Sequence, residues 1–115
     1  MKIKTNELTG AALDWAVAKC EFEGCEDWDG TLEGVDCVSD LQGLAYSPST
    51  DLAQGGPIIE REQLNLACLG EVWEAWPNTG MNDAIYCKGP TPLIAAMRCH
   101  VASKLGDIVE IPEAL

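Results

Sequence analysis

Basic side chains are scarce in this sequence, which has seven Lys and Arg residues against nineteen Asp and Glu residues and a formal net charge of −12. This imbalance repels nucleic acid and anionic membranes at long range, so direct DNA binding is disfavoured. The shortage is greatest between Lys19 and Arg61, where no basic residue occurs. The acidic side chains crowded into the first half of this stretch are therefore expected to be largely solvated.

Groups that carry catalysis or bind metals are also few. His100 is the one histidine, and the six cysteines do not form the tight pairs of a zinc site. His100 next to Cys99 is insufficient for a Cys-His hydrolase, and on the final helix it should lie between the apolar stripe and solvent, satisfied or exposed. Gly55-Gly56-Pro57 lacks the Lys and hydroxyl of a phosphate loop. We expect no enzyme activity, no metal and no cofactor.

Long apolar runs are missing as well. No run of seven or more apolar residues follows Met1-Lys2-Ile3-Lys4, so we expect neither a secretory signal nor a membrane span, and a protein that stays in the cytoplasm where it is made. In that reducing compartment the cysteines should be free thiols without a structural disulfide. The 115 residues, about half of them apolar, suffice for one core, so residues 1–115 are expected to form a single domain.

Apolar periodicity predicts three helices. Steps of three and four residues from Leu8 to Phe22 predict a helix that starts between Thr5 and Gly10 and ends by about Gly24. Residues 24–43 are rich in glycine and acid and are predicted to be a loop-rich insert. A hydroxyl cap at Ser49-Thr50 predicts a second helix to about Glu62, which should kink or begin afresh at Pro57. Thr91, as cap, and Pro92 predict a last helix that Gly106 ends.

Alternating residues predict strands between and outside these helices. Two antiparallel strands are expected at 64–68 and 72–76, a third at 84–87, and edge strands at Ile3-Lys4 and at 107–111. Strands and helices that are segregated in this way indicate the α+β class, with a small antiparallel sheet covered by helices.

Four ordered blocks of the sequence resemble the NinX family of small temperate-phage and prophage proteins. The blocks are Asp14-Trp15-Ala16-Val17-Ala18, Tyr46-Ser47-Pro48-Ser49-Thr50-Asp51, Gly55-Gly56-Pro57-Ile58-Ile59-Glu60, and Gly89-Pro90-Thr91-Pro92-Leu93-Ile94-Ala95-Ala96-Met97-Arg98. The order of elements is also similar to the phage alpha-beta-alpha sandwich domain, which implies a sheet covered by helices. The sequence departs from these families in its acidic insert around residues 21–43 and in Leu52, where relatives are expected to have an aromatic residue.

Two helix N-termini, several aromatic rings and one arginine make up a candidate site for an anionic nucleotide. The candidate ligand-binding residues are Tyr46, Ser47, Ser49, Thr50, Trp73, Thr91 and Arg98, with Trp76 as a further aromatic. Each has an ordinary structural interpretation: the hydroxyls cap helices, the tryptophans are core, and Arg98 pairs with a carboxylate.

Two functions from different classes follow. The first is a non-enzymatic phage accessory protein, expected to be a homo-oligomer, that sequesters a small nucleotide-type signal of host defence. The second is an acidic interaction protein that mimics nucleic acid and inhibits a host defence or recombination protein. Its partner-binding residues would be Glu21, Glu23, Glu26, Asp27, Asp29, Glu33, Asp36 and Asp40.

Overall fold

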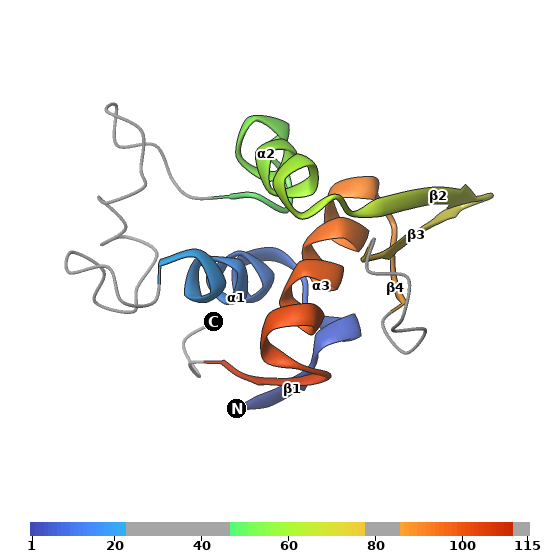
Figure 1. The fold of residues 1–115 in the computed structure, drawn as a ribbon. Helices are drawn as coiled ribbons and strands as arrows, with labels where there is room; N and C mark the ends of the chain where they lie inside the picture. The colour runs from blue at the N-terminus through green and yellow to red at the C-terminus, as the bar shows by residue number, and fades with distance from the viewer. Residues whose placement is uncertain (23–46, 78–85, 112–115) are drawn as a thin grey trace.

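The computed structural model describes residues 1–22, 47–77 and 86–111, and these form an α+β fold, as predicted (Figure 1). One short 3₁₀ helix and three α-helices are present in these ranges: η1 (Thr5–Glu7), α1 (Gly10–Phe22), α2 (Leu52–Glu62) and α3 (Pro92–Leu105). The strands are β1 (Lys2–Lys4), β2 (Asn65–Leu69), β3 (Val72–Trp76), β4 (Cys87–Gly89) and β5 (Ile108–Glu110). None of the described helices is long and apolar enough to cross a membrane.

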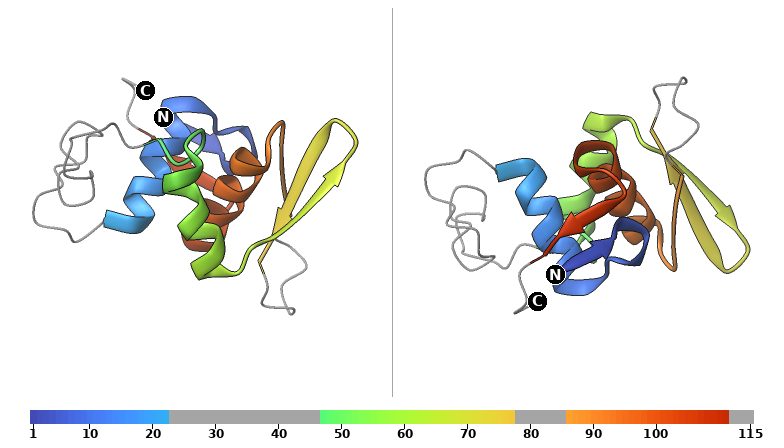
Figure 2. Two further views of the ribbon diagram at one scale, coloured as in Figure 1. Left: turned by 90° about the horizontal axis from the view of Figure 1, so that it is seen from above. Right: turned by 90° about the horizontal axis from the view of Figure 1, so that it is seen from below.

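The strands form two small antiparallel sheets. β2, β3 and β4 make a meander in that order, with Leu66 opposite Ala75 and Ala75 opposite Cys87. β1 and β5 pair with each other, with Ile3 opposite Val109, so the two predicted edge strands bring the ends of the described chain together (Figure 2).

The predicted third strand is present at Cys87 but begins after Tyr86 and extends to Gly89, as β4 (Cys87–Gly89), while residues 84 and 85 of the prediction lie outside the described ranges. A Cβ on Gly89 would stand 2.7 Å from the backbone nitrogen of Ala95. The glycine therefore allows the end of this strand to approach α3 closely, and it belongs to the strand rather than to a turn.

Helix α3 forms the centre of the molecule, with α1 and α2 packed against it and the three-stranded sheet on another side (Figures 1 and 2). Its residues Ala95, Ala96, Met97, Cys99 and Val101 are fully buried. Three small side chains in that set let neighbouring helices and strands approach α3 closely.

Helix α2 begins and continues differently from the prediction. Its N-cap is Asp51, whose Oδ1 accepts a 2.9 Å hydrogen bond from the backbone N–H of Ala53, so the predicted hydroxyl cap at Ser49-Thr50 was wrong. The short carboxylate of Asp51 is placed to reach that orphan N–H. The helix also continues through Pro57 to Glu62 and does not begin afresh there.

Candidate functional site

The segment before α2 contains four of the predicted ligand-binding residues, of which Tyr46 lies outside the described residues. Ser47 starts a turn in which its carbonyl accepts hydrogen bonds from the backbone N–H groups of Thr50 at 3.1 Å and Asp51 at 2.8 Å. Thr50 is exposed, and its hydroxyl donates back to the same carbonyl at 3.5 Å. Ser49, by contrast, is buried.

Ser49 joins this turn to α1. Its backbone N–H donates a 2.9 Å hydrogen bond to Oδ1 of Asp14, a carboxylate that is only 7% exposed. Burial raises the pKa of Asp14, while the hydrogen bonding of Ser49 acts in the opposite direction. Two blocks of the family resemblance therefore meet in a buried polar contact. This contact gives Asp14 and the backbone of Ser49 a structural role that needs no ligand.

Thr91 caps α3, as predicted. Its Oγ1 accepts a 3.1 Å hydrogen bond from the backbone N–H of Ile94, and Pro92 occupies the first turn. The side chain of Thr91 is exposed and borders Pro90, a residue that lines a hollow described below. Its role in ligand binding stays a prediction.

Arg98 binds backbone carbonyls, and among the described residues it pairs with no carboxylate, contrary to its ordinary structural interpretation. Its Nε donates to the carbonyl of Leu8 and one terminal nitrogen donates to the carbonyl of Lys88, both at 2.7 Å. Arg98 thus ties η1 to β4 across α3. Two of its five N–H groups make these bonds, which leaves three for other acceptors.

The predicted aromatic residues follow β3. Trp73 is half-buried, lies opposite Gly89 in the sheet and packs against the core. Trp76 stacks on Tyr86, with ring centroids 5.5 Å apart and planes inclined by 25°. Tyr86 is 45% exposed. The sequence analysis did not select it as a site residue.

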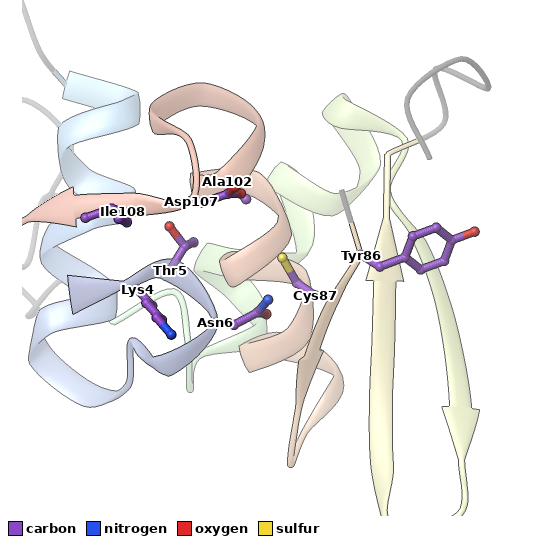
Figure 3. Close-up of a pocket in the computed structure, with 8 residues that line it drawn as sticks. All are labelled: Lys4, Thr5, Asn6, Tyr86, Cys87, Ala102, Asp107 and Ile108. Carbon is purple, nitrogen blue, oxygen red and sulfur yellow. The ribbon is translucent and has the colours of Figure 1, made fainter. Parts of the chain in front are cut away.

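Two adjoining hollows lie where η1, β4, α3 and β5 meet. The first has a volume of about 230 Å³ and the second about 470 Å³, and Asn6 and Tyr86 line both. We call the pair the η1–β4 groove. Its other described lining residues are Lys4, Thr5, Val72, Cys87, Lys88, Gly89, Pro90, Arg98, Ala102, Asp107 and Ile108. Figure 3 shows the first hollow between η1 and Cys87, with the Tyr86 ring extending away over the sheet.

The groove collects positive charge in an acidic chain. Lys4, Lys88 and Arg98 are three of the seven basic residues, whereas Asp107 is the one described lining residue among the nineteen carboxylates. Glu74 on β3 lies opposite Lys88 in the sheet but makes no ion pair with it. The groove is therefore locally cationic.

Of the predicted ligand-binding residues, Arg98 lines the groove, and Trp73 and Thr91 adjoin lining residues in sequence. Ser47, Ser49 and Thr50 line neither hollow. The sequence analysis missed Lys4, Asn6, Tyr86 and Lys88. Their spacing carries no motif, and only the crossing of η1, β4 and α3 brings them together.

Burial keeps the thiols near the core in their protonated, unreactive form. Burial raises the pKa of Cys87 to about 11 and of Cys99 to about 12, so both remain thiols at neutral pH. Cys68 is also a free thiol, while Cys25 and Cys37 lie outside the described residues. Within the described ranges no three His, Cys, Asp or Glu residues are grouped to hold a metal ion.

His100 differs from the prediction of a satisfied or exposed side chain. It is 1% exposed, and within the described part of the chain neither ring nitrogen has a hydrogen-bond partner. Burial lowers its pKa, which favours the neutral ring. The small residues of α3 let neighbouring elements close over this face of the helix, which the apolar stripe alone did not indicate.

The acidic residues of the second hypothesis fall almost entirely outside the described ranges. Glu21 alone is described, and its carboxylate accepts a 2.6 Å hydrogen bond from Arg61. Arg61 also contacts Glu62, which in turn pairs with Lys104 at 3.0 Å. Glu21 therefore joins α1 to α2 at the surface.

A comparison with known protein families finds one whose description is "Bacteriophage P22, NinX", and it matches residues 4–104. No curated protein matches the chain. The matched range includes all four blocks of resemblance. It also includes the described residues that line the η1–β4 groove, except Asp107 and Ile108 at one end of the first hollow. Because the match spans most of the chain, the protein belongs to the bacteriophage P22 NinX family.

Proposed function

We propose that this phage protein binds and sequesters a small nucleotide-type signal in the η1–β4 groove, without catalysis, and thereby counters host defence. One observation carries the proposal: three of the seven cations line the groove in a chain of net charge −12. Basic residues that serve only as solvated surface groups would not be expected to lie together beside one hollow. A bound anion would account for their position.

The lining groups suit a ligand with an anionic part and a ring. The ammonium groups of Lys4 and Lys88 and the remaining N–H groups of Arg98 are donors for phosphate oxygens. The Oδ1 of Asn6 accepts from the backbone N–H of Lys88 at 3.3 Å, so its amide NH₂ is left as a donor. The half-exposed ring of Tyr86 offers a stacking face for a base.

The net charge opposes an anionic ligand but does not decide the outcome. Charges more than about 8 Å apart are largely screened at physiological salt, so the groove's own charges dominate at contact. The net charge of −12 acts mainly at long range, where it slows the approach of an anion. Lowering the salt strengthens both the attraction of an anion to the groove and its repulsion by the net charge. We therefore expect the affinity to increase only a little at low salt.

Binding without chemistry is supported by the groups available. Cys87 lines the first hollow, but its raised pKa keeps it protonated, and His100 does not line the groove. The described lining residues thus offer donors and a ring but no nucleophile paired with a base.

A thermal-shift screen against cyclic dinucleotides and ADP-ribose-type compounds tests the proposal. A ligand at 100 times its Kd should stabilise the native state by about 2.7 kcal/mol. The test variant is Lys88→Gln on β4. The matched control is Lys104→Gln on α3, which removes the same charge from an ion pair with Glu62 and lines neither hollow. We expect Lys88→Gln to weaken binding about tenfold or more and the control to leave it unchanged. If no compound in the panel raised the melting temperature, the proposal would be refuted.

A second candidate function is the acidic interaction protein that inhibits a host defence or recombination protein. The stretch between Lys19 and Arg61 favours it, because residues 20–60 contain many acids and no basic residue. Neutralising at least four of the acids from Glu21 to Asp40 should abolish capture of a host protein and the salt sensitivity of that capture. Unchanged capture would refute this alternative.

A further inference from the structure

The two edges of the three-stranded sheet differ in how their backbone groups are satisfied. At β4 the backbone N–H of Lys88 donates to the side chain of Asn6, and its carbonyl accepts from Arg98. Both groups face away from β3, and both are bonded to side chains. The β4 edge is therefore closed to another strand.

The β2 edge is open. β2 and β3 are joined by the two-residue loop Gly70-Glu71, so Leu69 and Val72 form the closing pair of the hairpin. Alternation then directs the backbone N–H and C=O groups of Leu66 and Cys68 away from β3. No described residue hydrogen-bonds to these four groups. An unpaired row of this kind is a template for a further strand.

The strand also lacks the devices that usually protect an edge. β2 contains no charge, no proline and no bulge, and residues 63–70 as a whole carry no charged side chain. Cys68 is exposed and Leu69 is 51% exposed. Figures 1 and 2 show the β2–β3 hairpin projecting away from the helices, where another molecule can reach it.

We propose that two copies of the chain associate through β2, forming a continuous sheet of the order β4-β3-β2-β2-β3-β4. Pairing all five residues of both strands places the two-fold axis at Ala67. Leu66 of each copy then lies opposite Cys68 of the second copy, and these residues exchange the N–H···O=C bonds that one chain leaves unmade. The inference is independent of the ligand proposed for the groove.

A second copy fits this edge better than an unrelated strand for two reasons. The outward-facing residues are placed symmetrically about Ala67, so the strand is its own antiparallel complement. The neutral segment 63–70 is also where two chains of charge −12 can meet with least repulsion. A basic partner, which the whole chain would attract, would find no charge to pair with on β2.

Cross-linking tests the register. In a Cys68→Ser background, Ala67→Cys places two thiols at the axis, in a non-hydrogen-bonded pair whose Cα atoms are about 4.5 Å apart, within the range of a disulfide. Mild oxidation should give a covalent dimer. Glu71→Cys in the same background is the control, since its two copies would lie roughly 25 Å apart along the strands. Equal cross-linking of both, or none at Ala67→Cys, would overturn the proposal.

Native mass tests the association itself. The wild-type chain should show twice the 12.4 kDa of one chain at about 0.1 mM, since a small interface gives a weak complex. Ala67→Lys sets two like charges face to face and should return the mass to one chain while the melting temperature of the monomer is retained. Added salt should strengthen the dimer by screening repulsion. A monomeric wild type, or a dimer that Ala67→Lys leaves intact, contradicts the proposal.

Discussion

Adjacent glycines in α2 should respond in opposite directions to the same substitution. A Cβ added at Gly55 would overlap the backbone carbonyl of Pro48 and stand 2.7 Å from Cδ2 of Leu93. At Gly56 the nearest atom to such a Cβ is Cδ1 of Leu52, at an ordinary 3.5 Å. The two positions also differ in burial, since Gly55 is buried and Gly56 is half-buried, and Gly56 directly precedes Pro57.

The magnitudes follow from these contacts. Gly56→Ala should stabilise the fold by at most about 0.5–1 kcal/mol, since alanine loses less backbone entropy in a helix than glycine but its Cβ meets the ring of the following Pro57. Gly55→Ala gains the same term but overpacks against backbone, which costs about 1–3 kcal/mol. We expect Gly55→Ala to be less stable than Gly56→Ala by roughly that overpacking cost.

Urea denaturation of the two variants and the wild type, followed by far-UV circular dichroism, measures this order. The wild type should lie between the two variants, with similar slopes for all three. Equal free energies of unfolding for the variants, or a Gly55→Ala chain more stable than the wild type, would refute the packing of α2 against the Pro48 turn and α3.

Three further predictions concern single side chains. Arg98→Met should destabilise the fold by about 2–4 kcal/mol in thermal or urea unfolding, because the carbonyls of Leu8 and Lys88 lose charged donors, and Arg98→Lys should recover part of the loss. His100 has a lower pKa in the folded chain than in the unfolded chain, so the unfolded chain takes up a proton at a higher pH. The free energy of unfolding should therefore fall as the pH drops through about 6.5, and unfolding curves of His100→Phe should lack this pH dependence. Maleimide should label exposed Cys68 rapidly and buried Cys87 and Cys99 only on unfolding, as peptide mass mapping can establish.

Most elements of the fold could be predicted because each has a local signal. The cap at Thr91, Pro92 and the stop at Gly106 define α3 through residues that are neighbours in sequence, and the alternation in β2 and β3 is likewise local. The cap of α2 was misassigned because Ser49, Thr50 and Asp51 are all good caps. The choice among them depends on Asp14, which lies on another helix and binds the N–H of Ser49.

The candidate site could not be predicted in this way. Lys4, Tyr86 and Lys88 carry no local signal in the sequence. They line the groove through contacts between distant parts of the chain, such as the bonds from Arg98 on α3 to the carbonyls of Leu8, just after η1, and of Lys88 on β4. Charge counting identified the shortage of cations, but it could not show that three of them gather on one face.

Locating a bound ligand by NMR tests the central claim most directly. ADP-ribose or a cyclic dinucleotide is titrated into ¹⁵N-labelled protein, and the amide shifts are mapped. The account predicts the largest changes at Asn6, Tyr86 and Lys88, which line the η1–β4 groove. Changes centred on Ser47 to Thr50, with the groove unaffected, would contradict it and return the site to the turn before α2.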